Sequence, residues 1–171
     1  MNLVLDRMSS PIGTLLLVSD GEALCLLEFE DHEDRLHRAL RRLDPACALA
    51  PARSGNGAIR HIAAYFDGNL NALDDIPVRP RGTEFQRRVW QALRRIPPGT
   101  TTTYGRLAVA ISAPRSSRAV GLANGANPLA IVIPCHRVIG ADASLTGYGG
   151  GLHRKAWLLR HEAANASSST P

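Results

Sequence analysis

The chain begins with short apolar runs separated by turn residues, a pattern typical of β-strands. Residues 2–8, 12–19 and 23–29 each hold such a run, with Ser, Pro, Asp and Gly between them. They predict an antiparallel meander. The pattern then changes to leucines at helical spacing between charged residues, which predicts an amphipathic helix over 33–43. Residues 59–66 predict another helix.

The second part of the chain is patterned mainly for helices. Residues 73–82 are rich in proline, aspartate and arginine and predict a linker. Thr83, followed at the third position by Gln86, is a capping box and predicts the start of a helix. Residues 103–125 have the rhythm of a helix-turn-helix, and residues 152–162 predict a last helix.

One short apolar run carries candidate chemistry directly after it. The β-branched run Ile131–Ile133 predicts a buried strand that Pro134 ends, because proline lacks a backbone donor. Cys135 and His136 follow, with Arg137 next to them. Positive surroundings lower the pKa of a cysteine and favour the nucleophilic thiolate. The alternative is a small buried cysteine beside a hydrogen-bonded histidine.

Composition limits the class of protein. The 171 residues suffice for one good-sized domain or two small ones, and 44% hydrophobic with 20% charged residues fit a soluble globular protein. The chain has neither a signal-peptide pattern nor an apolar run of about 18 residues, so we expect an intracellular, cytoplasmic protein. Its three cysteines are widely spaced without a C-x-x-C pair, which argues against a disulfide framework and a four-ligand zinc site.

The charge is divided unevenly along the chain. Residues 1–78 carry seven arginines against twelve acidic residues, whereas residues 79–171 carry thirteen basic residues against three acidic ones. A preference for arginine over lysine does not explain why the acidic residues are segregated. This asymmetry predicts that the second part of the chain faces a polyanion.

The second helix of the helix-turn-helix, residues 115–124, carries little side-chain bulk. Its Gly121 costs about 1 kcal/mol of helix propensity relative to alanine. Such a helix can approach a flat or grooved partner closely. The alternative is close packing against another helix inside the core. The basic charge around the helix favours nucleic acid.

A glycine-rich loop with one aromatic residue, Thr146 to Gly151, follows the cysteine segment. It lacks the trailing Gly-Lys-Ser/Thr of a phosphate-binding P-loop. We interpret it as a mobile wall of a binding pocket.

Several short motifs follow one another through this part of the chain. They are Arg-Ala-Val-Gly at 118–121, Ala-Asn-Gly-Ala-Asn-Pro at 123–128, Ile-Pro-Cys-His-Arg-Val at 133–138, Thr-Gly-Tyr-Gly-Gly-Gly at 146–151 and Trp-Leu-Leu-Arg-His-Glu at 157–162. In order and spacing, this set closely resembles the O6-alkylguanine-DNA alkyltransferases, also called methylated-DNA–protein-cysteine methyltransferases. The resemblance is strong over residues 79–163 and weaker over the N-terminal part.

The resemblance implies a set of catalytic roles. Cys135 would attack the O6-alkyl carbon of the damaged guanine. His136 would act through a water as the base that helps to form the thiolate, and Glu162 would orient it. Tyr104 would donate a proton towards N3 of the leaving guanine. Asn127 would hold the turn between the recognition helix and the active site.

The resemblance also implies a substrate pocket and a DNA-binding surface. The pocket would include Val138, Tyr148, Gly149, Gly150 and Arg137. A buried thiol cannot reach an atom inside a stacked duplex, so the nucleotide must be flipped out, with Arg118 filling its place. The other DNA-binding residues would be Ser117, Ala119, Ala123, Gly125 and Thr102.

The predicted elements and the resemblance together imply an α+β fold. A small N-terminal antiparallel sheet with helices would occupy residues 1–75, with a linker over 76–82. A mainly helical catalytic and DNA-binding domain, containing a helix-turn-helix of winged-helix type, would occupy 83–163, and a disordered tail 164–171. The expected activity is irreversible, single-use transfer of the alkyl group from O6-alkylguanine, and from O4-alkylthymine, in double-stranded DNA.

No cofactor or metal is expected, because displacement by a thiolate forms a stable thioether in one step. We expect no membrane association and a monomer in solution, with cooperative assembly on DNA left open. Two positions differ from some family members: Ala130 replaces a proline and Gly149 a serine. Both side chains are smaller, so we expect a roomier pocket.

Two other functions are consistent with parts of the sequence. A cysteine hydrolase could use Cys135, His136 and Glu162 as a triad, but it would leave the helix-turn-helix and the basic half unexplained. A DNA-binding sensor without chemistry would not need Cys135. Repeated turnover on an acyl substrate would favour the hydrolase.

Overall fold

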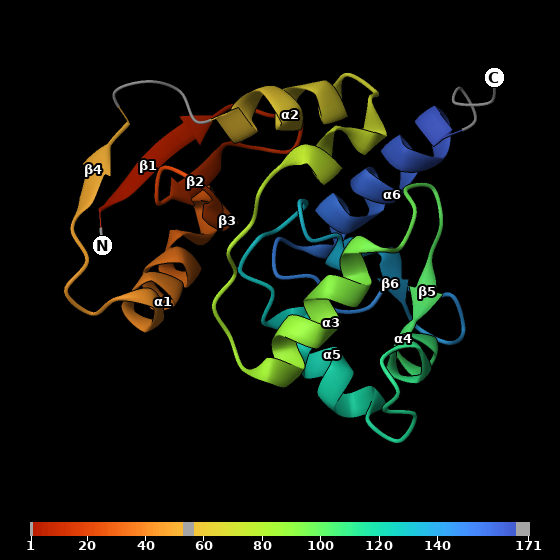
Figure 1. Ribbon diagram of the computed structural model, residues 1–171. Coiled ribbons are helices and arrows are strands. Elements are labelled where there is room, and N and C mark those ends of the chain that lie inside the picture. Colours follow the sequence, from red (N-terminus) through yellow and green to blue (C-terminus); the bar gives the residue numbers. More distant parts are fainter. Residues whose placement is uncertain (1, 53–56, 167–171) are drawn as a thin grey trace. The chain divides into compact units, whose positions relative to one another are not determined.

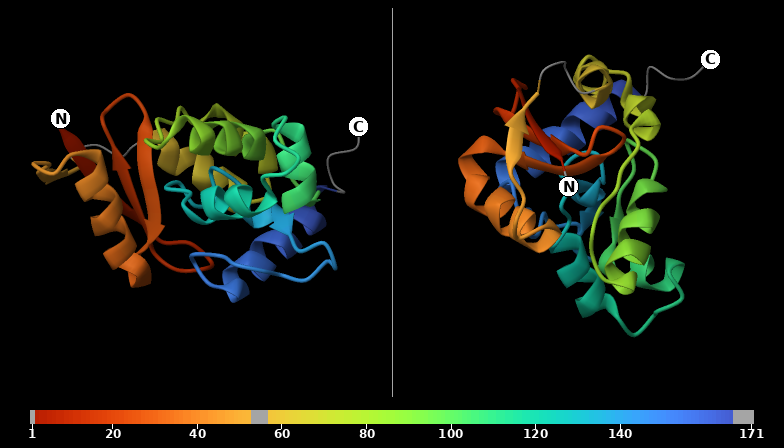
Figure 2. Two further views of the ribbon diagram at one scale, coloured as in Figure 1. Left: turned by 90° about the horizontal axis from the view of Figure 1, so that it is seen from below. Right: turned by 60° about the vertical axis from the view of Figure 1, so that its left-hand side comes forward.

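The computed structural model describes residues 2–52 and 57–166 (Figures 1 and 2). The chain divides into two compact units. One comprises Met1–Arg81 together with Pro128–Val132, and the other comprises Gly82–Asn127 and Ile133–Pro171. Within the described ranges, no helix is both long and apolar enough to span a membrane.

The N-terminal unit contains a four-stranded sheet in the order β3-β2-β1-β4. Strands β1 (Leu3–Met8), β2 (Leu15–Ser19) and β3 (Leu24–Phe29) form the predicted antiparallel meander. The prediction of a purely antiparallel sheet is wrong, because β4 (Leu49–Pro51) pairs parallel with β1. This strand is three residues long and contains proline, as edge strands often do, so it has no strand pattern of its own.

Among the described residues of this unit, two helices and two short 3₁₀ segments accompany the sheet. Helix α1 (Glu33–Leu43) has the predicted bounds, and its leucines enter an apolar cluster with residues of β1, β2 and β3. Helix α2 (Gly57–Phe66) begins two residues before its predicted start. The 3₁₀ segments are η1 (Glu30–His32) and η2 (Leu70–Asp75).

The segment Pro128–Val132 belongs to the N-terminal unit, although the sequence placed it in the C-terminal domain. Leu129 forms an isolated bridge with Leu27, and the Leu27 amide donates to the Pro128 carbonyl at 2.9 Å. The predicted strand over 131–133 is wrong, since these residues form turns and Ile131 has a φ of 71°. The amide of Val132 instead donates to the Ala130 carbonyl, so no ladder forms.

The C-terminal unit is mainly helical and contains the predicted helix-turn-helix. Thr83 and Gln86 form the predicted capping box at the start of the first helix. The elements are α3 (Glu84–Arg94), β5 (Thr102–Thr103), α4 (Tyr104–Ala110), α5 (Ser117–Gly125), η3 (Cys135–Arg137), β6 (Val138–Ile139) and α6 (Leu152–Ala166). Helices α4 and α5 are the helix-turn-helix, and β5 pairs parallel with β6.

The end of the chain differs from the prediction. Helix α6 runs to Ala166, so residues 164–166 are helical and not part of a disordered tail. The rest of that predicted tail, residues 167–171, lies outside the described residues. The α+β class is confirmed, whereas the domain boundaries at 75 and 83 and the winged-helix assignment stay predictions.

Candidate active site

Tight turns present Cys135 at the start of η3. Pro134, with φ −80° and ψ 64°, is the centre of an inverse γ-turn, and the Cys135 amide donates to the Ile133 carbonyl at 2.8 Å. The side-chain amide of Asn127 donates to the same carbonyl, also at 2.8 Å. Asn127 therefore ties the residue after α5 to the turn before the cysteine. Cys135 itself is 7% exposed.

A buried carboxylate organises the two residues that follow the cysteine. Glu162 of α6 is fully buried; its Oε1 accepts from His136 Nε2 at 2.7 Å, and Arg137 donates to both of its oxygens at 2.8 and 2.9 Å. Burial by itself raises the pKa of Glu162. The hydrogen bonds from His136 and Arg137, together with the charge of Arg137, outweigh burial and hold that pKa far below its ordinary value.

His136 is held as a neutral base. Burial lowers its pKa, and the nearby charges of Arg137 and Lys155 act in the same direction, against the opposing effect of Glu162. Because Nε2 faces a carboxylate, we assign the proton to Nε2, which leaves Nδ1 with an acceptor lone pair. Within the described part of the chain, this buried Nδ1 has no hydrogen-bond partner.

Arg137 is placed differently from its predicted role. The sequence assigned it to the substrate pocket, but the side chain is buried and its guanidinium is committed to Glu162 and to the Ile96 carbonyl, which it reaches at 2.6 Å. It therefore positions the carboxylate and joins η3 to the residues after α3. The bidentate geometry matches the fork of an arginine.

Lys155 is a candidate site residue that no sequence motif indicated. It is fully buried on α6, and its Nζ donates to the carbonyls of Val138 and Thr146 at 2.5 and 2.6 Å. Burial lowers its pKa, whereas interaction with Cys135 raises it. That interaction is mutual, so the ammonium favours a thiolate at Cys135. The available signal was that the chain has a single lysine.

The glycine-rich loop is held at both of its ends. Thr146 is fixed through its carbonyl by Lys155, and its hydroxyl lies 3.3 Å from the Tyr104 hydroxyl in a hydrogen bond. At the other end, Arg154 Nη1 donates to the Gly150 carbonyl at 3.0 Å. Tyr148 and Gly149 between these anchors are half-buried. These contacts hold both ends of the loop, and the mobility of the residues between them stays a prediction.

Helix α5 divides the predicted DNA-binding residues into two groups. Ser117, Arg118, Ala119 and Gly125 are exposed. Ala123 is 3% exposed and its carbonyl accepts from Trp90 Nε1, so its assignment to the DNA-facing side is wrong. Its position on the helix places it with the core residues and not with Arg118.

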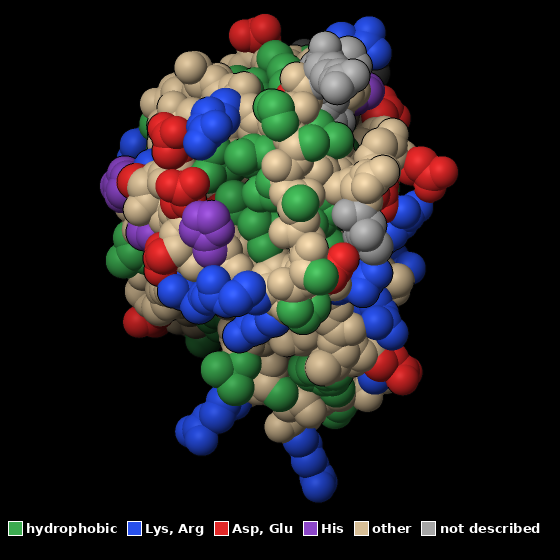
Figure 3. All heavy atoms as spheres, turned by 90° about the vertical axis from the view of Figure 1, so that its left-hand side faces the viewer, with side chains coloured by type: hydrophobic (Ala, Val, Ile, Leu, Met, Phe, Trp, Pro, Cys, Tyr) green, Lys and Arg blue, Asp and Glu red, His purple; other side chains and the backbone are tan. Residues whose placement is uncertain are grey.

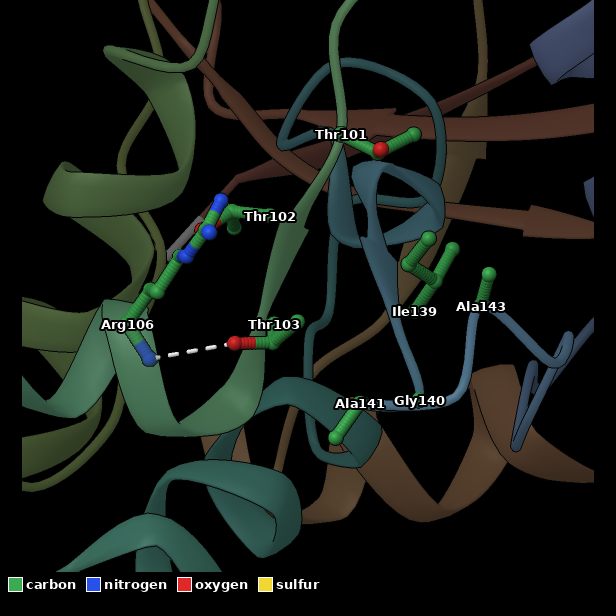
Figure 4. Close-up of a pocket in the computed structure, with 8 residues that line it drawn as sticks. All are labelled: Thr101, Thr102, Thr103, Arg106, Ile139, Gly140, Ala141 and Ala143. Atoms are coloured by element: carbon green, nitrogen blue, oxygen red, sulfur yellow. Dashed lines mark hydrogen bonds between the residues drawn. The ribbon is translucent and has the colours of Figure 1, made fainter.

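Thr102 lines an open cavity of about 370 Å³. The threonines of residues 101–103 form one side of it and the turn at 139–143 forms the other (Figure 4). Arg106 also lines the cavity, and its backbone amide donates to the Thr103 hydroxyl. Hydroxyls and a guanidinium can bind an anion such as a phosphate.

The described residues offer no cluster of three or more His, Cys, Asp and Glu side chains suited to a metal ion. The site instead combines a thiol, a neutral imidazole, a buried carboxylate and a buried ammonium. These are the parts of an activated nucleophile with a base and an orienting group.

Replacing Arg137 by alanine is expected to destabilise the protein by about 3–5 kcal/mol, because it leaves Glu162 buried without its bidentate partner. Urea denaturation measures the effect. Arg87→Ala is the matched control, since Arg87 also donates to a backbone carbonyl but is exposed. Equal losses in the two variants would contradict the assignment.

The folded protein is expected to lose stability on acidification. The pKa values of His136 and Glu162 are both lowered, so the unfolded chain binds more protons than the folded one. Stability should fall as the pH drops below the ordinary histidine value of 6.5, and again below the glutamate value of 4.5. The urea midpoints at pH 7 and pH 5.5 should differ less in His136→Gln than in the unmodified protein. A midpoint that rises on acidification would refute this expectation.

Comparison with known proteins identifies relatives of the whole chain. The family model for "6-O-methylguanine DNA methyltransferase, DNA binding domain" matches residues 84–164, and that for the "ribonuclease-like domain" of the same family matches residues 5–80. Methylated-DNA–protein-cysteine methyltransferases from Salmonella typhimurium and Mycolicibacterium paratuberculosis are 44% and 48% identical, each over 95% of this chain and over 96% and 93% of their own lengths.

Solved structures agree with these matches. The crystal structure of Mycobacterium tuberculosis O6-methylguanine methyltransferase has a TM-score of 0.80 at 42% identity and covers 95% of this chain and 94% of that chain. The M. tuberculosis protein in complex with DNA has a TM-score of 0.80 at 43% identity, covering 96% and 94%. Both family models, the relatives and the fold agree with the motifs read from the sequence. The chain therefore belongs to the 6-O-methylguanine DNA methyltransferase family.

Proposed function

We propose that this protein repairs double-stranded DNA by transferring the alkyl group of O6-alkylguanine, and of O4-alkylthymine, to Sγ of Cys135. The observation that carries the proposal is the Glu162–His136 pair, which leaves a buried acceptor nitrogen on the residue next to the cysteine. Membership of the family and the basic helix-turn-helix support the same reaction.

The transfer is a single displacement. The Cys135 thiol passes its proton through a water to His136 Nδ1, and Lys155 stabilises the resulting thiolate. The sulfur attacks the alkyl carbon, an S–C bond forms, and the C–O6 bond breaks with its electron pair moving into the guanine. Tyr104 donates a proton towards N3, which neutralises the departing guanine anion. Exchange with solvent then restores the N1–H tautomer of normal guanine, and the proton taken up by His136 balances the reprotonation of Tyr104 through solvent. The thioether has no route back to a thiol, and each molecule acts once.

The pocket for the flipped base would be built from main-chain groups and small residues. The Val138 carbonyl already accepts from Lys155, and its second lone pair can accept from the exocyclic amine of guanine. Tyr148, Gly149 and Gly150 would close around the alkyl group. The short side chain at 149 leaves room for groups larger than methyl.

Helix α5 would bind in the minor groove of the DNA duplex. Residues 104–127 include Arg106, Arg115 and Arg118, all exposed, and contain no acidic residue. Arg118 would occupy the gap left by the flipped nucleotide, and Ser117, Ala119 and Gly125 would face the groove. The cavity beside Thr102 and Arg106 would take a backbone phosphate. The cytoplasmic location, the monomeric state and cooperative assembly on DNA stay predictions.

Incubation with a duplex that contains O6-methylguanine is expected to add the mass of one methyl group to the peptide that holds Cys135. Cys135→Ala should transfer nothing while still binding the duplex. Cys47→Ala is the matched control, because Cys47 is also a free cysteine, and it should react normally. Peptide mass spectrometry distinguishes the sites. Methylation of Cys25 or Cys47 alone, or repeated turnover, would refute the proposal.

Arg118→Ala is expected to slow transfer from duplex DNA by about tenfold or more, because an intercalating side chain supports the flipped state. Its reaction with free O6-benzylguanine should be close to that of the unmodified protein, since no base has to be flipped. Arg160→Ala, an exposed arginine on α6, serves as control. Equal losses on both substrates would count against the role of Arg118.

A further inference from the structure

The recognition helix carries one large apolar side chain that the proposed function does not use. Leu122 is 73% exposed on α5, more than the two other large apolar residues that stand out among the described residues, Val109 at 63% and Leu152 at 48%. A single exposed leucine needs no explanation by itself. The position of Leu122 relative to Arg118 gives it significance.

Leu122 and Arg118 lie on the same side of α5. They are four residues apart, about one helical turn, so their side chains are neighbours along the helix surface. Both line an open groove of about 440 Å³, together with Tyr104, Ser117 and Gly121. The Tyr104 ring lies 3.7 Å from the point where a side chain at Gly121 would begin. The absence of that side chain keeps the groove open between Tyr104, Leu122 and Arg118.

The charge around the groove indicates which partner it would contact. Arg106, Arg115 and Arg118 are exposed on this part of the chain, and no acidic residue occurs between positions 104 and 127. At the lower end of the surface, where α5 lies in Figure 1, long basic side chains project with hydrophobic side chains between them (Figure 3). A polyanion with apolar surface between its charges fits such an arrangement. The minor groove, with sugars and base edges between two rows of phosphates, is such a surface.

We propose that Leu122 is a second, apolar wedge, which enters the minor groove one helical turn from Arg118 and packs against bases next to the extruded nucleotide. This inference rests on the proposed function and names a further residue for it. Proteins that widen the minor groove commonly insert leucine or a similar side chain between base steps. Arg118 would then fill the vacated position, while Leu122 would stabilise the opened stack beside it.

The test compares Leu122→Ala, Leu122→Gln and Leu122→Met with Val109→Ala, a matched control that shortens another exposed apolar side chain, on α4. Transfer rates are measured on a duplex with O6-methylguanine, on the same strand without its complement, and on free O6-benzylguanine. Leu122→Ala and Leu122→Gln should slow repair of the duplex about three- to tenfold, the loss expected from one partly buried apolar contact.

The other substrates separate a wedge from a general defect. The transfer rates of Leu122→Ala and Leu122→Gln should fall less on single-stranded DNA, because there is no paired stack to open. Their rates on free O6-benzylguanine should not change. Leu122→Met should restore most of the duplex rate, since methionine is also a long apolar side chain. Val109→Ala should stay within about twofold of the unmodified protein on every substrate.

Four results would overturn the proposal. Unchanged duplex repair by Leu122→Ala would refute the role of Leu122 as a wedge, while the proposed alkyl transfer would stand. Equal losses on duplex and free base would mean that Leu122 acts through the fold of the active site. Loss of a dimer in size-exclusion chromatography, with unchanged repair, would assign the groove to a second copy of the chain. If the unmodified protein transferred no alkyl group from any DNA, the proposed function would fail together with the wedge.

Discussion

The buried carboxylate of Glu162 is the interaction on which the rest of the C-terminal unit depends. A charge without solvent requires compensating partners, and here they come from the two residues after the candidate nucleophile. Arg137 neutralises the carboxylate and also donates to the Ile96 carbonyl just after α3. The hydrogen bond from His136 Nε2 to Glu162 fixes the orientation of the imidazole ring. The same contacts that hold η3 against α6 thus set the protonation state of the imidazole. Stability and chemistry cannot be altered independently at this position.

Much of the fold follows from local signals that the sequence displays. The leucines of α1 have helical spacing, and the observed helix has the predicted bounds. The capping box at Thr83 satisfies amides within one turn, so its meaning does not depend on distant residues. Cys135, His136 and Glu162 were identified by motif, and the last two lie in contact. Their distance along the chain, from position 136 to 162, could not by itself have predicted that contact.

What the sequence could not predict depends on tertiary contacts. Lys155 resembles a surface lysine until the fold buries it and brings the carbonyls of Val138 and Thr146 to its amine. Ala123 differs from Ala119 only by its side of the helix, and the fold buries that side, where Trp90 Nε1 donates to the Ala123 carbonyl. The run at 131–133 has strand propensity, yet its neighbouring residue Leu129 makes the bridge to β3 and the run itself turns. Strand propensity at 131–133 is therefore overridden by tertiary contacts, because the bridge to β3 forms at Leu129.

The assignment of Pro128–Val132 to the N-terminal unit has a consequence for dissecting this protein. A fragment cut at residue 82 keeps every group of the candidate active site, but it also keeps a segment whose packing partners have been removed. Leu129, Ile131 and Val132 are buried in the intact chain. In the fragment these apolar side chains would become exposed to solvent a few residues before Cys135. A single cut in the chain therefore cannot separate the two units, because the C-terminal fragment still contains the segment 128–132 of the N-terminal unit.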